Sequence, residues 1–245
     1  DGNDEKKNRD AIPNILSDAL SVSFDNNVGH DYLLNYEERY EFYHKKEEKI
    51  EFDLEYFNKI TKGGLPNKTL NIALAGTGVG KSLFMCHVAS SVLLQGRNVL
   101  YVTMEMAEEK IAERIDANLL DVSIQDLSDL PKLMFENKVT DVSKKTQGQL
   151  IIKEYPTAGA HSGHFKTLLN ELALKKSFKP DIIFIDYLNI CASSRYRAAA
   201  NVNSYSYIKA IAEELRGLAV EANVPIVSAT QTTRSGFASS DVDLT

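Results

Sequence analysis

Between residues 69 and 229, short apolar segments of strand length alternate with longer segments whose apolar residues recur at helical spacing. The strand-like segments are Thr69–Ala75, Asn98–Thr103, Gln149–Lys153, Asp181–Asp186 and Pro225–Ala229. The helix-like segments are Lys81–Leu94, a stretch from about Ala107 to Leu120, Phe165–Lys175 and Ser204–Ala222. This alternation predicts an α/β fold, with a mainly parallel sheet covered by helices on both faces. Ligands of such sheets bind beyond the carboxyl ends of the strands.

A glycine-rich segment, AGTGVGKS, joins the first of these strands to the first helix and matches the Walker A pattern with Ala75 in place of its first glycine. Its glycines allow backbone N–H groups to turn toward one anion, and the helix that follows points its positive end at the same place. Lys81 is expected to reach the β- and γ-phosphates, and Ser82 to give its hydroxyl to Mg²⁺. The segment therefore predicts a site for ATP or another nucleoside triphosphate with magnesium. Its residues are Gly76, Thr77, Gly78, Val79, Gly80, Lys81 and Ser82.

Polar residues at the ends of three other strands extend this prediction. Asp186 ends an apolar strand in a Walker B pattern, where a carboxylate can hold the magnesium shell beside Ser82. Glu105 ends the second strand, and its position fits equally a general base near the γ-phosphate and an acid that favours a helix start. Gln231 follows the last strand, where its amide would sense the γ-phosphate or be an ordinary polar loop residue.

The bulk composition narrows the class of protein. The chain has 245 residues and is 43% hydrophobic, which predicts one large domain, or a domain with a short extension, and argues against general disorder. No apolar run approaches the roughly 18 residues of a membrane span, and the charged start is not a signal peptide. Because the chain does not begin with Met, it is expected to be part of a longer protein. A net charge of −6 disfavours coating duplex DNA with the whole surface, although a small basic patch stays compatible with it.

Several stretches resemble the C-terminal motor domain of DnaB-type replicative helicases, and most closely the helicases of T-even-like phages. Met104-Glu105-Met106, followed by Arg114, is the most specific of them. The others are Ile60–Gly64, Ala75–Ser82, Tyr101–Asp121, Ile183–Leu188 and Lys209–Glu221, so that the resemblance covers roughly Phe52 to Thr245.

The resemblance implies a RecA-like P-loop NTPase that moves 5′ to 3′ along single-stranded DNA during DNA replication. It implies a ring of six subunits, a primase and a helicase loader as partners, and a cytoplasmic location, in the host if the chain is phage-encoded. Glu105 becomes the catalytic base, Asp186 the magnesium carboxylate and Gln231 the γ-phosphate sensor. Arg114 matches a family arginine, but chemistry alone assigns it no function.

The resemblance also divides the chain. Residues 1–51 correspond to a helical linker, and residues 52–245 to the motor domain without its C-terminal part. In the family, a linker helix docks on the neighbouring subunit. An apolar stripe in this chain could dock in the same way, or it could pack on the chain's own core. The stripe consists of Ile12, Ile15, Leu16, Ala19 and Leu20. Since an arginine finger contributes about 10³–10⁵ in rate and would lie beyond Thr245, this chain alone is expected to be a weak ATPase that does not unwind DNA.

Two segments are candidates for DNA contact. The first follows the Walker B strand and carries Arg195, Tyr196 and Arg197 without an acidic residue. Arginine binds phosphates and tyrosine stacks on bases, although a solvated loop would show the same composition. The second begins at Thr232 and contains Arg234.

Two other functions share the same core. A RecA-type recombinase or regulatory ATPase would have the same site, and strand exchange rather than strand displacement would reveal it. A non-catalytic assembly or loading scaffold would bind ATP without hydrolysing it, and the full set of Lys81, Ser82, Asp186 and Glu105 argues against that function.

Overall fold

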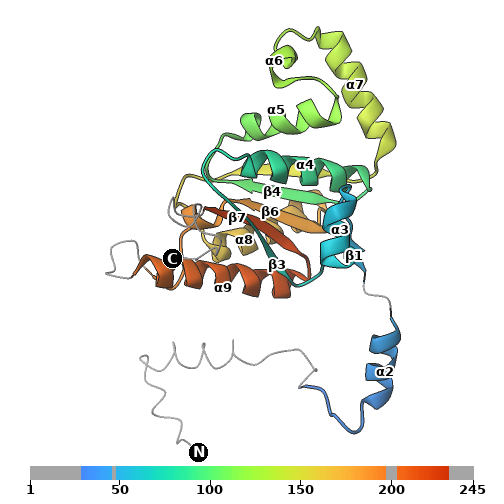
Figure 1. Ribbon diagram of the computed structural model, residues 1–245, viewed down its shortest axis with the longest axis vertical. Helices are drawn as coiled ribbons and strands as arrows, with labels where there is room; N and C mark the ends of the chain where they lie inside the picture. The colour runs from blue at the N-terminus through green and yellow to red at the C-terminus, as the bar shows by residue number, and fades with distance from the viewer. Residues whose placement is uncertain (1–28, 46–47, 197–202, 232–245) are drawn as a thin grey trace, which may run out of the picture. The chain divides into compact units, whose positions relative to one another are not determined.

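The computed structural model describes residues 29–45, 48–196 and 203–231 (Figure 1). The chain divides into two compact units, Asp1–Glu47 and Glu48–Thr245. The described part of the first unit contains helix α2 (Tyr36–His44), none of whose residues is buried. The apolar stripe predicted near residues 12–20 lies outside the described residues. The second unit begins slightly before the predicted boundary at Phe52, because β1 (Lys49–Ile50) pairs with β2 (Leu65–Pro66).

The elements of the second unit follow the predicted alternation. Its other strands are β3 (Leu70–Ala75), β4 (Val99–Thr103), β5 (Leu150–Glu154), β6 (Ile182–Asp186) and β7 (Ile226–Gln231). Its helices are α3 (Glu55–Thr61), α4 (Lys81–Leu94), α5 (Glu108–Leu119), α6 (Ile124–Leu127), α7 (Lys132–Lys145), α8 (Ser162–Lys176), the 3₁₀ turn η2 (Leu188–Ile190) and α9 (Ser204–Ala222).

Five strands form one parallel sheet in the order β3-β7-β6-β4-β5. Parallel strands place all their carboxyl ends at one edge of the sheet. The order brings the ends of four neighbouring strands, β3, β7, β6 and β4, side by side at that edge. The register sets Ala75 opposite Gln231 and Thr103 opposite Asp186. The predicted α/β class and mainly parallel sheet are confirmed.

Alternate strand residues pack on opposite faces, which produces two cores. Tyr101 and Phe184 face α4 and α5, whereas Val102 and Ile185 face α8 and α9. Figure 1 shows α4 on one side of the sheet and α9 on the other. The predicted apolar face of α9 is buried at Ile211, Leu215 and Leu218, while Ile208 and Ala222 are partly buried against the same core. The central strands β4 and β6 are buried on both faces and therefore read as nearly continuous apolar runs. On the edge strand β3, Ile72 and Leu74 stay exposed.

Several elements were not predicted. The strands β1 and β2 are too short to show a period of two, and α3, α6 and α7 add helical turns to segments that carried no prediction. Helix α7 has no buried residue. Because it buries no face, its sequence does not need the apolar stripe by which an amphipathic helix is recognised. None of the helices within the described ranges has both the length and the apolar character needed to cross a bilayer.

Candidate nucleotide site

The glycine-rich loop has the backbone shape that an anion cradle requires at two of its glycines. Gly78 and Gly80 have φ values of 75° and 101°, which residues with a Cβ rarely adopt, and Gly80 is the residue immediately before α4. Gly76 was expected to share this property, but it does not have a positive φ. It contributes instead through its carbonyl oxygen, which accepts a hydrogen bond from Lys81 Nζ at 3.0 Å. Lys81 is only 9% exposed, so its ammonium group is held at the loop.

The loop forms one wall of a pocket of about 230 Å³ at the carboxyl edge of the sheet. The pocket is lined by Thr77, Gly78, Gly80, Lys81, Ser82, Leu83, Glu105, Met106, Arg114 and Gln231. Of the predicted loop residues, Gly76 and Val79 do not line the pocket: Gly76 is buried, and Val79 is 60% exposed. A larger cavity of about 290 Å³ beside α8 and α9 contains none of the predicted site residues. Predicted residues from the ends of β3, β4 and β7 therefore line one pocket, whereas Asp186 at the end of β6 is buried and does not line it.

Asp186 is fully buried at the end of β6, and one of its two carboxylate oxygens accepts a hydrogen bond from a side chain. The Tyr101 hydroxyl donates a hydrogen bond to Oδ2 at 3.0 Å, and the Tyr101 ring stacks on Phe184. Burial raises the pKa of Asp186 above its ordinary value, although Ser82, Tyr101, Arg114 and Lys81 lower it in part. Oδ1 is buried and has no hydrogen-bond partner within the described residues.

This orphaned oxygen fits a magnesium ion. Mg²⁺ takes oxygen ligands and is held in proteins by one or two carboxylates together with phosphate oxygens and waters. The Ser82 hydroxyl lies near enough to Asp186 to lower the pKa of its carboxyl group, so the two predicted metal residues are neighbours. Ser82 and Asp186 Oδ1 therefore provide a donor set for Mg²⁺ beside the phosphate loop.

Tyr101 was not predicted to belong to the site, and its contribution can be measured. Replacement of Tyr101 by Phe removes the hydrogen bond to Asp186 Oδ2 while keeping the ring. A buried carboxylate without its donor is expected to reduce the free energy of unfolding by about 1–3 kcal/mol at pH 7, measured by urea titration. Tyr56→Phe is the matched control, because the Tyr56 side chain is 73% exposed on α3. Equal stability of the two variants would show that the Tyr101 hydroxyl does not support Asp186.

Glu105 lies in the turn after β4 rather than at the strand end, because β4 ends at Thr103. The Thr103 hydroxyl closes this turn by accepting from Met106 N at 3.1 Å and donating to Met106 O at 2.8 Å. Glu105 thereby projects into the pocket, and the acidic first turn of α5 is filled by Glu108 and Glu109 instead. Partial burial, with Asp186 next in effect, raises the pKa of Glu105, while Lys81 and Arg114 lower it. This placement favours the base over the helix-start interpretation.

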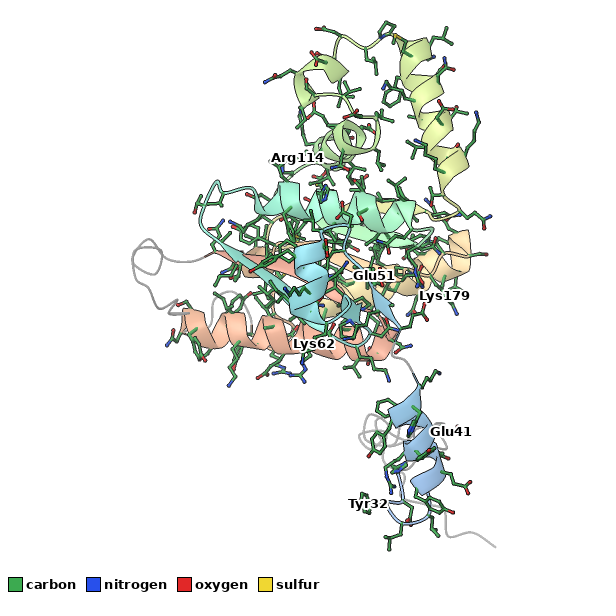
Figure 2. The ribbon with its side chains drawn as sticks, turned by 45° about the vertical axis from the view of Figure 1, so that its right-hand side comes forward. Tyr32, Glu41, Glu51, Lys62, Arg114 and Lys179 are labelled. Atoms are coloured by element: carbon green, nitrogen blue, oxygen red, sulfur yellow. The ribbon has the colours of Figure 1, made fainter. Side chains whose placement is uncertain are left out.

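Arg114, which had no predicted function, projects from α5 (Figure 2). It lines the same pocket. Its positive charge lowers the pKa of both Glu105 and Asp186. Arg114 therefore helps to keep the two carboxylates charged beside one another. Two predicted acids at one site could have suggested a nearby cation, but only the fold shows that α5 brings Arg114 there.

Gln231 was expected to follow the last strand, but it is the last residue of β7 itself. Its register position opposite Ala75 places it beside the phosphate loop, and its side chain lines the pocket. The strand continues to Gln231 because Thr230 and Gln231 still pair with β3, although both residues are polar.

Of the two candidate DNA segments, the structure describes only the start of the first, up to Tyr196. Arg195 and Tyr196 lie after η2, and Arg195 Nη1 pairs with Glu213 Oε2 on α9 at 2.5 Å, both side chains being about half exposed. The Tyr196 ring lies 6.5 Å from that of Tyr207. Arg197 and Arg234 lie outside the described residues.

The five-stranded sheet and the pocket at its carboxyl edge define a P-loop ATPase domain of the RecA-like α/β class. The chain belongs to the family of DnaB-like helicase C-terminal domains, whose family model matches residues 50–241. This confirms the family that the Met104-Glu105-Met106 run indicated.

Individual relatives agree with this assignment. The DnaB-like replicative helicase of Enterobacteria phage T4 is 49% identical over 248 residues, which cover 98% of this chain and 52% of the relative. A replicative DNA helicase DnaB of Helicobacter pylori is 28% identical over 70% of this chain and 34% of its own length. The chain thus spans about half the length of the T4 relative and about a third of the bacterial one.

Solved structures share the fold. A DnaB-like replicative helicase, described with its interactions with primase, superposes with a TM-score of 0.67 at 16% identity and covers 95% of this chain and 55% of that structure. A second solved structure, of an ATPase domain, superposes with a TM-score of 0.64 at 17% identity and covers 86% of this chain and 73% of its own. These likenesses support the α/β architecture.

Proposed function

We propose that this chain is the ATP-driven motor of a replicative DNA helicase that moves along single-stranded DNA. The observation that carries the proposal is that Lys81, Ser82, Glu105 and Gln231 line one pocket in a chain of the DnaB-like family. Asp186 is buried next to this pocket, where Ser82 and Lys81 lower its pKa. By the resemblance to that family, the movement would be 5′ to 3′.

In the proposed mechanism, the triphosphate lies along the loop with its phosphates against the backbone N–H groups and Lys81. Mg²⁺, when bound, supplies positive charge that neutralises the phosphate oxygens. Glu105 orients a water molecule toward the γ-phosphorus and accepts its proton, a base function for which a raised pKa is suited. The water oxygen forms a bond to the γ-phosphorus as the bond from this phosphorus to the ADP oxygen breaks, which yields ADP and inorganic phosphate, and Lys81 stabilises the charge that develops. Arg114 holds Glu105 charged, and Gln231 responds to the loss of the γ-phosphate.

Partners are part of the same proposal. Single-stranded DNA, a six-membered ring, a primase and a helicase loader follow from the family resemblance, as does a cytoplasmic location, which is that of the host if the chain is phage-encoded. The described interactions of one structural relative with primase are compatible with the primase proposal.

A second candidate is a function in DNA repair or recombination. The DNA repair protein RadA of Campylobacter jejuni is 34% identical to this chain, but over only 95 residues, or 39% of the chain. The ATPase rate of the intact protein with and without single-stranded DNA, together with strand-displacement and strand-exchange assays, tests the two. The helicase proposal predicts DNA-stimulated hydrolysis and strand displacement, and strand exchange without displacement would favour the second candidate.

The DNA contact is tested through the basic segment after η2. Replacing Arg195 and Arg197 by Ala in the intact protein is expected to weaken single-strand binding and to make its salt dependence shallower. If each arginine contacts one phosphate, the slope of log K against log salt should decrease by about 1.4 in magnitude. Arg216→Ala, at an exposed arginine on α9, is the matched control. An unchanged slope in the double variant would remove this segment from the DNA-binding surface.

A further inference from the structure

One hydrogen bond joins the strand that carries Gln231 to the turn that precedes the basic segment. The Thr230 hydroxyl donates to Asn189 Oδ1 at 2.7 Å. Thr230 is the residue before Gln231 on β7. Asn189 is the middle residue of η2, which a single residue, Tyr187, separates from β6. Both side chains are half-buried, so water competes little for the bond.

The two neighbouring residues of β7 lie on opposite faces of the sheet. Successive strand side chains alternate, and Gln231 lines the nucleotide pocket on the α4 side. Thr230 therefore points to the other side, where η2 lies between β7 and α9. A shift of the strand end that accompanies a change at Gln231 must also move Thr230, because the backbone joins the two residues directly.

The residues between η2 and the basic segment are also fastened to α9. Ser193 Oγ donates to Glu214 Oε1 on α9 at 2.7 Å, Ser194 N donates to the same carboxylate at 3.0 Å, and Ser162 Oγ donates to its other oxygen at 3.0 Å. Burial alone would raise the pKa of Glu214, but these hydrogen bonds lower it, which keeps the carboxylate charged at neutral pH. The stretch from Asn189 to Arg195 is thus held at both ends by side-chain contacts.

We propose that the Thr230–Asn189 hydrogen bond transmits the nucleotide state sensed by Gln231 to the basic segment that begins at Arg195. Thr230 and Asn189 are positioning residues in this account, since neither lines the pocket. The inference rests on the proposed function, because it requires that Gln231 senses the γ-phosphate and that Arg195 contacts DNA. Coupling between the two sites then passes through one neutral bond and is expected to be reciprocal.

The test measures coupling rather than activity alone. In the intact protein, Thr230→Val removes the hydroxyl while keeping the shape, and Thr230→Ser restores it. The stimulation of ATP hydrolysis by single-stranded DNA is expected to fall about 2- to 12-fold in Thr230→Val, the range that corresponds to one neutral hydrogen bond. The Thr230→Ser variant should keep the wild-type stimulation. In Asn189→Ala the stimulation should fall by the same factor as in Thr230→Val. The difference in DNA affinity between the ATP-analogue and ADP states should shrink by a similar factor.

Ser228→Ala is the matched control, because the Ser228 hydroxyl also links β7 to β6, by donating to Ile185 O at 2.7 Å, but does not reach η2. This variant is expected to lose stability without losing the DNA stimulation ratio. Combining Thr230→Val with Asn189→Ala should lower the ratio no further than either change alone. Equal ratios in wild type and Thr230→Val, or additive losses in the double variant, would overturn the inference. Absence of DNA stimulation in the wild type would overturn the proposed function itself, and the coupling with it.

Discussion

Replacement of Lys81 by Ala is expected to weaken the binding of Mg·ATP by at least about 100-fold, because two charge-assisted contacts to the phosphates contribute about 1.5–3 kcal/mol each. The side chain is held ready for these contacts, with Nζ on the Gly76 carbonyl and only 9% of its surface exposed. The phosphates would replace that carbonyl as the partner of the ammonium group. Hydrolysis should fall with binding, since the same charge stabilises the transition state. Calorimetric titration with a non-hydrolysable ATP analogue measures the first effect directly.

Lys179→Ala provides the matched control for this prediction. Lys179 is an exposed lysine just before β6 (Figure 2). Its backbone oxygen accepts a hydrogen bond from Asn98, which lies just before β4, so Lys179 lies at the amino edge of the sheet. Its removal changes the net charge equally but should leave nucleotide affinity within about threefold of the wild-type value, because an exposed distant charge is screened by salt. Similar affinities for the two variants would mean that Lys81 does not contact the phosphates.

Replacement of Glu105 by Gln is expected to reduce ATP hydrolysis by about 10²–10⁴-fold while leaving nucleotide affinity nearly unchanged. The amide keeps the size of the side chain but cannot accept the proton of the attacking water. Single-turnover hydrolysis and analogue binding, measured on the same preparation, separate the two effects. Glu109→Gln, at an exposed acid in the first turn of α5, should hydrolyse ATP at the wild-type rate.

The pH dependence of hydrolysis provides a second test of the Glu105 prediction. Only the deprotonated carboxylate accepts a proton, so the rate should decline as the pH falls through the pKa of Glu105. Partial burial and the charge of Asp186 raise that pKa, so the decline should begin at a higher pH than the ordinary value of 4.5 implies. The Glu105→Gln variant should lack this limb of the profile. An identical acid limb in the variant would assign it to another group.

Much of the fold could be predicted because it depends on local patterns. Apolar runs of strand length alternate with amphipathic segments. A strand buried on both faces is apolar at nearly every position, as Ile182–Asp186 is. The glycine-rich segment is also recognisable, because an anion cradle needs glycines at fixed offsets before a helix, and Gly78 and Gly80 have the required dihedrals. The predicted bounds of α4 and α9 are confirmed, whereas α8 begins at Ser162, before the predicted start at Phe165, because His161 caps its first turn.

The remaining features depend on strand order, which periodicity does not reveal. Tyr101 reads as one more apolar residue of β4, and it meets Asp186 only because β4 lies beside β6. The bond between Thr230 and Asn189 likewise requires β7 to lie beside β6. Arg114 enters the pocket because α5 packs on α4. Each of these contacts joins residues that are distant in the chain, so no local pattern could have predicted it.

A structure of the protein with a non-hydrolysable ATP analogue and Mn²⁺ in place of Mg²⁺ tests the central claim most directly. The account predicts the phosphates along Gly76–Ser82, an anomalous metal peak between the Ser82 hydroxyl and Asp186, and Glu105 facing the γ-phosphate. A nucleotide bound elsewhere on the chain, or a metal peak away from Asp186, would contradict the assignment of this pocket as the site of ATP hydrolysis.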